Sequence, residues 1–231
     1  MLATIFHSGP GALLLDLLFP PKCAFCGKLM ERFGDGVCPD CAKNLPFIED
    51  GKVLRAIGAH RYPCAVALYY DGMVKEGVHA LKFGRTSWRA GVFGRCIAQT
   101  AAEHLGGQFD AVTFVPVSPR RNFQRGFDQA RLLAEAAGKI WGVEAEPILR
   151  KIRHNRAQSS LEDPALRHKN VENAYLVRRP RLAAGRRFLL IDDVCTTGST
   201  LSACADTLMA AGAASVVCAA LAGGHGDGKE R

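Results

Sequence analysis

The sequence predicts an α/β protein in which a mainly parallel sheet carries helices on both faces, with a small four-cysteine module in front of it. From about residue 66 to residue 221, short apolar runs alternate with segments of helical periodicity. Such alternation is typical of a parallel sheet, because parallel strands need crossover connections that are usually helices. Before residue 45, closely spaced cysteines and glycines break the pattern. We therefore expect two modules of different construction.

The alternating segments can be assigned in order along the chain. Strands are expected at residues 66–70, 111–115, 143–149, 174–177, 188–191 and 215–221, and helices at about 74–84, 90–105, 126–141, 164–173 and 199–211. Gly84 ends the first helix, and Pro116 stops the second strand. Ligands of such sheets bind beyond the carboxyl ends of the strands. The loops that follow Pro116 and Asp192 should therefore lie at the binding edge.

Length and composition set the size and the charge of the protein. The chain has 231 residues and 48% hydrophobic content, enough for one α/β domain and a smaller module. We expect a short amphipathic helix at 1–19, the four-cysteine module at 20–45, the main domain at 46–222 and a flexible tail at 223–231. Lys and Arg number 30 against 22 Asp and Glu, a formal net charge of +8. This surplus suits a polyphosphate or nucleic-acid partner but is weak evidence by itself.

The N-terminal apolar run predicts neither a membrane span nor a secretion signal. No stretch reaches the ~18 apolar residues that a membrane helix needs. The run at 12–19 contains Asp16, has no basic segment before it and continues into Pro20 and Pro21, unlike a cleavable signal peptide. Nine cysteines, an odd number, also argue against a secreted disulfide framework. We expect a cytoplasmic protein.

Four of the cysteines, Cys23, Cys26, Cys38 and Cys41, form a C-x2-C-x11-C-x2-C pattern. Each pair presents two thiolates from a tight turn, and two pairs complete a tetrahedral metal site. The spacing favours structural zinc in a compact double knuckle. Four thiolates also suit an iron–sulfur cluster, whereas thioredoxin-like redox use is disfavoured because pairs this close satisfy one metal better than two disulfides. A site with four protein ligands is closed, so it supports folding or presents a surface to a partner and does not catalyse.

The segment from Phe188 to Thr200 has the features of an anion site. Four apolar residues typical of a buried strand precede two carboxylates, Asp192 and Asp193, and then a hydroxyl-rich turn that opens a helix. Backbone N–H groups and the positive end of the helix dipole favour an anion there. Ionised carboxylates accept hydrogen bonds from vicinal hydroxyls or bind a hydrated metal ion. Phosphate beside a diol is the outline of ribose 5-phosphate; the alternative is a capped helix beside a chance acidic pair.

This segment resembles the phosphoribosyl diphosphate (PRPP) motif of type I phosphoribosyltransferases, in which a hydrophobic strand and an acidic pair precede Thr-Thr-Gly-x-Thr. The resemblance implies that Asp192 and Asp193 hold the ribose hydroxyls and that Mg²⁺ accompanies PRPP. It also implies a type I phosphoribosyltransferase-like fold. The residues that would wrap the 5′-phosphate are Thr196, Thr197, Gly198, Ser199 and Thr200. Cys195, at the variable position, is interpreted as a bystander and not as a nucleophile.

A second group of charged residues follows the strand that Pro116 ends. Arg120, Arg121 and Arg125 offer planar, forked donors that suit a diphosphate. The prolines of this segment and Gly126 fit a loop that stays open until a ligand arrives. The alternative interpretation is a solvated basic loop.

Taken together, the motifs resemble the ComF family, bacterial phosphoribosyltransferase-like proteins linked to DNA uptake in natural competence. The motifs are the four-cysteine module, Leu81-Lys82-Phe83, Val115-Pro116-Val117 with Arg120 and Arg121, the run Arg125–Gln129, Gln158-Ser159 with Arg167 and Asn170, and the PRPP motif. The resemblance implies PRPP binding, with the three arginines and Lys82 on the diphosphate side. Single-stranded DNA and a DNA-uptake helicase are the macromolecular partners that it implies. Asp128 stands where the family commonly has Asn.

Two classes of function remain open from the sequence. One is an active phosphoribosyltransferase of nucleobase or amine metabolism, in which arginines and Mg²⁺ stabilise the leaving pyrophosphate. The other is a PRPP-binding module of the DNA-uptake machinery. The intact acidic pair and phosphate turn favour retained PRPP binding. No residue cluster identifies an acceptor, so the sequence does not indicate turnover.

Overall fold

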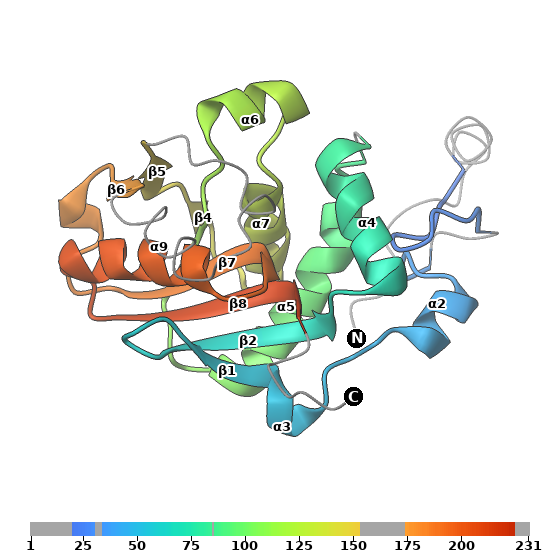
Figure 1. The fold of residues 1–231 in the computed structure, drawn as a ribbon, viewed down its shortest axis with the longest axis horizontal. Helices are drawn as coiled ribbons and strands as arrows, with labels where there is room; N and C mark the ends of the chain where they lie inside the picture. Colours follow the sequence, from blue (N-terminus) through green and yellow to red (C-terminus); the bar gives the residue numbers. More distant parts are fainter. Residues whose placement is uncertain (1–19, 31–33, 85, 153–173, 225–231) are drawn as a thin grey trace.

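The computed structural model describes residues 20–30, 34–84, 86–152 and 174–224 (Figure 1). Its strands are β1 (Leu54–Ile57), β2 (Tyr62–Tyr69), β3 (Ala111–Phe114), β4 (Ala145–Glu146), β5 (Leu149–Lys151), β6 (Tyr175–Val177), β7 (Arg187–Cys195) and β8 (Ser215–Gly223). Six strands form one sheet in the order β1-β2-β8-β7-β3-β4, and β5 pairs separately with β6. Within the six-stranded sheet only β1 and β2 pair antiparallel. The expected mainly parallel sheet is therefore confirmed.

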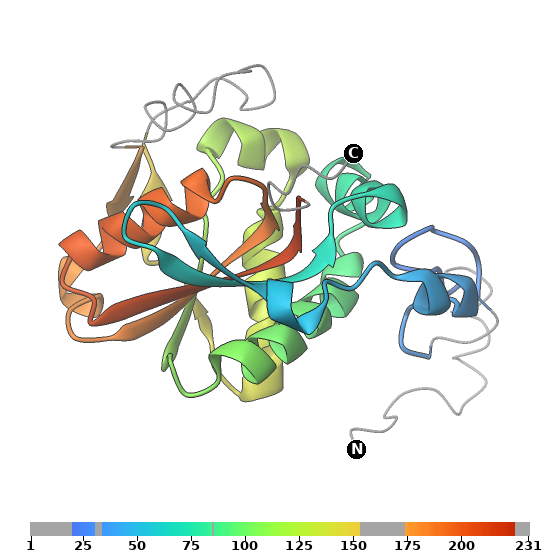
Figure 2. The same cartoon turned by 60° about the horizontal axis from the view of Figure 1, so that its bottom comes forward.

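Helices cover both faces of this sheet, as predicted. They are α2 (Pro39–Asn44), α3 (Asp50–Val53), α4 (Gly72–Phe83), α5 (Arg89–Leu105), α6 (Pro119–Arg125), α7 (Gln129–Trp141) and α9 (Ser199–Ala210), with a short 3-10 turn η2 (Pro180–Leu182). On one face, α5 and α7 pack against each other and against β2, β8, β3 and β7. On the other face, α9 covers β7 and β8 and contacts β6 (Figure 2).

The central strand β7 explains the apolar run that precedes the acidic pair. It lies between β3 and β8, with Leu189 opposite Val112 on one side and Val217 on the other. Residues 188–191 are fully buried, because helices cover both faces of the sheet at this point. Since β2, β3, β7 and β8 run parallel, their carboxyl ends share one edge. That edge carries α4, α6 and the turn before α9.

The predicted boundaries differ from the structure in two places that affect the site. β7 does not end at Ile191 but continues to Cys195 beside β8, so the acidic pair lies inside the strand. The segment expected as an open loop after Pro116 contains α6, which the Ser118 side chain and Pro119 initiate. This helix buries no residue, so it has no apolar periodicity from which to predict it. The following helix begins at Gln129 and not at Gly126, because Gly126 caps the end of α6.

The ends of the chain add little to this description. The helices expected at 1–19 and 164–173 lie outside the described residues, as do residues 225–231 of the expected tail. β8 includes Gly223, which pairs with Tyr69 and Cys195. Among the described residues, every helix is too short or too polar to cross a membrane.

Candidate functional site

Asp192 and Asp193 lie at the carboxyl edge of the sheet and, as neighbours on a strand, point to opposite faces. Asp193 is buried on the side of α4, where its Oδ1 lies 3.0 Å from Nζ of Lys82. Asp192 is half-buried on the side of α9, and its Oδ1 accepts the backbone N–H of Asp193 at 2.8 Å. The two carboxylates therefore have different surroundings, although they are adjacent in sequence.

The ion pair between Lys82 and Asp193 is mostly buried, with 19% and 7% of the two side chains exposed. Burial alone lowers the pKa of Lys82, but the charge of Asp193 outweighs this and raises the pKa above its ordinary value. Asp193 Oδ2 is the buried side-chain oxygen that lacks a hydrogen-bond partner within the described part of the chain. An unsatisfied buried acceptor costs about 1–3 kcal/mol. This oxygen therefore has hydrogen-bonding capacity that no described residue uses.

Asp192 is held in an unfavourable electrostatic environment. Burial, together with the charge of Asp193 beside it, raises the pKa of Asp192 well above its ordinary value. A carboxylate whose pKa is raised in this way is stabilised by a hydroxyl donor or a cation, because either one favours the ionised form. The acidic pair is thus electrostatically suited to a ligand that brings positive charge or hydroxyl groups.

Two functional candidates, Lys151 and Tyr175, were not predicted from the sequence. They face each other across the β5–β6 pair, with Lys151 Nζ 3.2 Å from the Tyr175 hydroxyl. Burial lowers the pKa of Lys151, and the positive charge of Arg121 lowers it further. Burial and the nearby Cys204 and Asp192 raise the pKa of Tyr175. A single lysine in a three-residue strand carries no periodic or motif signal, so nothing in the sequence marks it.

The three arginines of α6 are not equivalent. Arg125 lies with its guanidinium carbon 4.9 Å from the centre of the Phe83 ring, at the end of α4, and donates to Gln129 Oε1 at 2.8 Å. Burial lowers the pKa of Arg125, while the charge of Asp193 opposes that shift. Arg121 is half-buried near Lys151, and Arg120 is exposed. The structure thus brings Arg125 toward Asp193 and Arg121 toward Lys151, and it leaves Arg120 on the surface.

Asp128, the residue at which the family commonly has Asn, holds the loop after β3 to α7. Its Oδ2 accepts the backbone N–H of Val117 at 3.0 Å, and its Oδ1 accepts that of Arg131 at 3.2 Å. Both carboxylate oxygens are thus used for backbone contacts, and burial raises the pKa of this group. Asp128 therefore positions the arginine-bearing segment through contacts of both its carboxylate oxygens.

The turn between β7 and α9 has the geometry expected of a phosphate turn. Gly198 has a φ of +73°, and a Cβ there would lie 2.7 Å from the Cβ of Ile57. The hydroxyls of Thr197 and Ser199 lie 2.7 Å apart, and Gly198 is the N-cap of α9. The first N–H groups of a helix have no intrahelical partner. Hydroxyl and amide donors therefore gather directly after the acidic pair.

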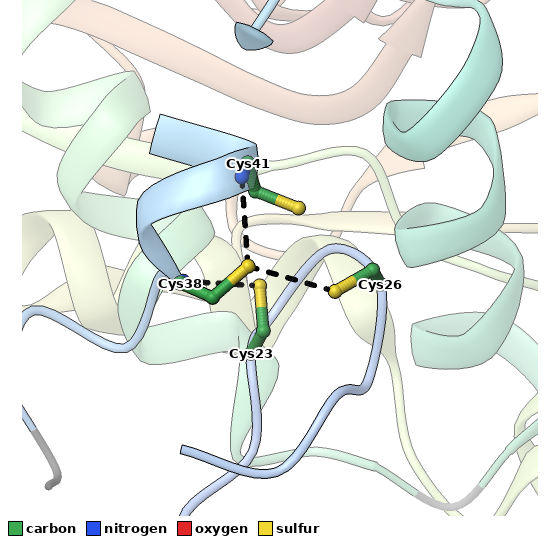
Figure 3. Close-up of side chains that lie close together, drawn as sticks. All are labelled: Cys23, Cys26, Cys38 and Cys41. Atoms are coloured by element: carbon green, nitrogen blue, oxygen red, sulfur yellow. Dashed lines mark hydrogen bonds between the residues drawn. The ribbon is translucent and has the colours of Figure 1, made fainter. Parts of the chain in front are cut away.

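The four predicted cysteines come together in one cluster, and Figure 3 shows their sulfurs turned toward one another. All four Sγ atoms lie within 4.8 Å of each other, and Cys26 Sγ is 3.8 Å from Cys38 Sγ. Sulfurs bound at about 2.3 Å to one tetrahedral zinc ion lie about 3.8 Å apart, whereas a disulfide needs about 2.05 Å. The cluster therefore fits a bound metal ion and not a pair of disulfides.

The backbone around the cluster stabilises thiolates. The N–H groups of Cys38 and Cys41 point at the sulfurs of Cys23 and Cys38, at 3.4 and 3.5 Å. Although burial raises the pKa of Cys23, the backbone N–H groups of Cys38, Cys26 and Phe25 bring it down to about 7. The second cysteine pair differs from the expected knuckle, because Cys38 caps the helix α2 and Cys41 lies within it.

Some residues of the sequence motifs cannot be placed. Gln158, Ser159, Arg167 and Asn170 lie outside the described residues. The remaining candidates lie at two places, the carboxyl edge of the sheet and the four-cysteine cluster.

A parallel sheet with an acidic pair and a hydroxyl-lined turn at its carboxyl edge is the arrangement of the phosphoribosyltransferase-like fold class. Comparison with family models agrees, since the phosphoribosyl transferase domain matches residues 126–231. A double zinc ribbon domain matches residues 14–53, so the four-cysteine cluster is a zinc-ribbon site. The predicted fold class is therefore confirmed for both modules.

The relatives narrow this class to one family. The chain is 34% identical over 207 residues to the DNA utilization protein YhgH of Escherichia coli (strain K12), across 84% of this chain and 86% of that protein. It is 29% identical over 196 residues to the competence protein ComFC of Streptococcus pneumoniae, across 84% of each. A more distant similarity, at 22% identity and a TM-score of 0.40 over 59% of this chain and 26% of that chain, is to a Bacillus subtilis glutamine PRPP amidotransferase. The chain belongs to the family of YhgH and ComFC, the ComF family that the motifs indicated.

The geometry of the turn between β7 and α9 predicts that one added methyl group at Gly198 lowers the stability of the protein. Gly198→Ala should destabilise the protein by about 1–3 kcal/mol, because a non-glycine residue at positive φ is strained and the new Cβ overlaps Ile57. Gly91→Ala is the control, since Gly91 lies in α5 with open space around it and should tolerate alanine. Chemical denaturation of both variants measures the difference. Equal stability of the two variants would contradict the assigned turn geometry.

The four-cysteine cluster predicts one zinc ion per chain. Elemental analysis of the purified protein should find it, and the double variant Cys23→Ser with Cys26→Ser should lose it because two thiolate ligands are removed. Cys96→Ser is the control, since Cys96 lies outside the cluster. Iron with visible absorbance in place of zinc would reject the assignment.

Proposed function

We propose that this protein binds PRPP or a related ribose 5-phosphate at the carboxyl edge of its sheet and that it acts in DNA uptake. The observation that carries the proposal is the unsatisfied Oδ2 of buried Asp193, one residue from Asp192 and four from Thr197 of the hydroxyl-lined turn. Backbone and hydroxyl donors suit a phosphate, and carboxylates suit ribose hydroxyls. The DNA-uptake role rests on relatives described as DNA utilization and competence proteins.

Each charged group then has a place around the ligand. The 5′-phosphate lies against the turn at 196–200, and the ribose hydroxyls donate to Asp192 and Asp193. Arg121, Arg125 and Lys151 are the cations that the diphosphate would meet, because Arg125 lies near Asp193, Lys151 lies near Asp192, and Arg121 lies near both of these cations. Lys82, expected at first on the diphosphate side, holds Asp193 in place through their ion pair. Mg²⁺ prefers carboxylate and phosphate oxygens, and it would offset the charge of the bound diphosphate beside Asp192.

The alternative within the same class is an active phosphoribosyltransferase of nucleobase or amine metabolism without a DNA role. Both hypotheses require PRPP binding, and they differ in whether an acceptor displaces pyrophosphate. Incubating the protein with PRPP and a panel of nucleobases and amines, and measuring released pyrophosphate, distinguishes them. Acceptor-dependent release would favour the enzyme, and binding without release would favour the binding module.

The surroundings of the two acidic residues predict that their substitution changes the stability of the ligand-free protein in opposite directions. The pKa of Asp192 is raised by folding, so its ionisation costs stability as the pH rises above the ordinary Asp pKa of about 4. Asp192→Asn should therefore raise the Tm by about 2–4 °C at pH 8 and by less at pH 5. Asp193→Asn should lower the Tm at pH 8, because it leaves Lys82 buried without a counter-charge.

The same variants test the ribose assignment. PRPP with Mg²⁺ should raise the Tm of the wild-type protein, because a ligand that binds only the folded state stabilises it. Both variants should lose this increase. Asp206→Asn is the control, since Asp206 lies on α9 and contacts Tyr62, away from the acidic pair. An undiminished PRPP shift in both acidic variants would disprove the ribose assignment.

The surface of α6 favours a nucleic-acid partner for this protein. Phe123 is 91% exposed, and Arg120 lies three residues before it, on the same side of the helix. Single-stranded DNA is bound by exposed aromatic rings that stack on bases, with arginines along the backbone. No residue of α6 is buried, so packing does not account for an exposed phenylalanine there. We assign α6 as a contact surface for single-stranded DNA.

This surface predicts a selective loss of DNA binding. Phe123→Ala should weaken binding of a short oligothymidine by about 5- to 100-fold, since stacking on one base is worth about 1–3 kcal/mol. Phe47→Ala is the matched control, because Phe47 is 58% exposed but lies before β1, outside α6. Fluorescence anisotropy at several salt concentrations gives the affinities and the salt slope, and Arg120→Gln should reduce that slope by about one. Equal losses from both phenylalanine variants would exclude α6 as the specific surface.

A further inference from the structure

Arg89, the first residue of α5, is a buried cation for which no carboxylate partner lies among the described residues. Its Nη1 donates to three successive backbone carbonyls of the first cysteine turn, those of Cys23, Ala24 and Phe25. Burial lowers the pKa of Arg89, and the charges of Cys23 and Cys26 oppose that shift. A buried charge is costly unless it is paired. The negative groups nearest to Arg89 are those of the four-cysteine centre.

The charge of a metal-loaded centre accounts for this burial. Four thiolates around one Zn²⁺ carry a net charge of about −2. Lys28 also lies near the centre, but it is exposed and pairs with Asp40 at 3.1 Å. Arg89 approaches from the protein interior and satisfies the carbonyls of the turn that presents Cys23 and Cys26. Its position therefore suits both the shape of the turn and the charge of the loaded centre.

The same guanidinium also reaches the end of α4. Its Nε donates to Thr86 Oγ1 at 3.1 Å, and Thr86 Oγ1 donates to the carbonyl of Ala80 at 2.8 Å. Ala80 lies in the last turn of α4 together with Lys82, whose ammonium pairs with Asp193. A chain of polar contacts thus runs from the four-cysteine turn through Arg89 and Thr86 to the acidic pair.

Close packing supports the same connection along the side of α4. A Cβ on Gly77 would lie 3.2 Å from the carbonyl oxygen of Ala24 and 3.1 Å from Phe93. The Phe25 and Phe93 rings pack with their centres 5.1 Å apart. The first cysteine turn therefore lies directly against α4 and α5.

We propose that Arg89 is a positioning residue that connects the metal centre to the acidic pair. It balances the charge of the loaded centre and, through Thr86, holds the turn of α4 that carries Lys82 to Asp193. Metal loading and ribose-phosphate binding are then energetically coupled, and each strengthens the other by the same factor. The second half of this inference rests on the proposed function, and the first half does not.

Zinc release tests the first half without any ligand. Arg89→Gln should accelerate zinc transfer to a colorimetric chelator by about tenfold or more, a typical effect of losing an outer contact to a metal centre. Arg89→Lys keeps the positive charge but not the forked guanidinium, so its rate of zinc transfer should lie between those of Arg89→Gln and the wild type. Arg95→Gln is the matched control, because Arg95 also lies on α5 and donates to the ribbon carbonyl of Asp35, yet it is exposed. Equal release rates for Arg89→Gln and Arg95→Gln would overturn the proposal.

Substitutions of Thr86 test the coupling to ribose-phosphate binding separately from the role of Arg89 at the metal centre. In zinc-loaded protein, Thr86→Val should leave zinc release unchanged but weaken PRPP binding by about 2- to 10-fold, the effect of one hydrogen bond. Thr86→Ser, which restores the hydroxyl, should recover the affinity. Titration calorimetry of the zinc-loaded variants gives these values. If the wild type binds PRPP and Thr86→Val binds it equally well, the coupling is disproved.

The two hypotheses fail in different ways. If the wild type does not bind PRPP, the proposed function fails, whereas the comparison of Arg89→Gln with Arg95→Gln still decides the role of Arg89. Should Arg89→Gln not fold, the intermediate release rate expected of Arg89→Lys and the Thr86 pair keep the proposal testable. A release rate of Arg89→Lys equal to that of Arg95→Gln would then count against the charge-and-fork argument.

Discussion

The ion pair between Lys82 and Asp193 is the contact on which the candidate site depends. It joins the end of α4 to the central strand β7 at the edge where four parallel strands end. Because the pair is mostly buried, water cannot readily replace either partner, and loss of one side chain would leave the other as an unpaired buried charge. One oxygen of Asp193 is thereby in use, and the other has no hydrogen-bond partner within the described part of the chain.

The surroundings of the two carboxylates divide the site into two sides. Asp193 faces α4 and α6, where Lys82 and Arg125 compensate its charge. Asp192 faces α9 and the β5–β6 pair, where burial raises its pKa, the charge of Lys82 opposes that shift, and Lys151 also lies nearby. The alternation of side chains along one strand is enough to produce this arrangement.

Sequence reasoning found the parts of the site that local patterns specify. The acidic pair, the phosphate turn and the cysteine cluster were predicted because each occupies one short segment with fixed spacing. Lys151, Tyr175 and Arg89 were not, because their surroundings depend on how distant segments pack. The same limit explains α6, whose Ser118–Pro119 start signal is local but whose lack of a buried face removes the usual periodicity. The parallel order of the sheet followed from alternation, while the extension of β7 through Asp193 depended on pairing with β8.

The position of the zinc ribbon also bears on why a closed metal centre is present in this protein. A centre with four protein ligands has no open position for a substrate, so its contribution must be made through what it packs against. It packs against α4 and the start of α5, and α4 ends at the lysine that holds Asp193. An isolated helix of twelve residues is marginal in water and needs packing to keep its last turn in place. The ribbon supplies that packing on the side of α4 opposite the acidic pair, which makes the metal centre part of the site's framework although it lies outside the site.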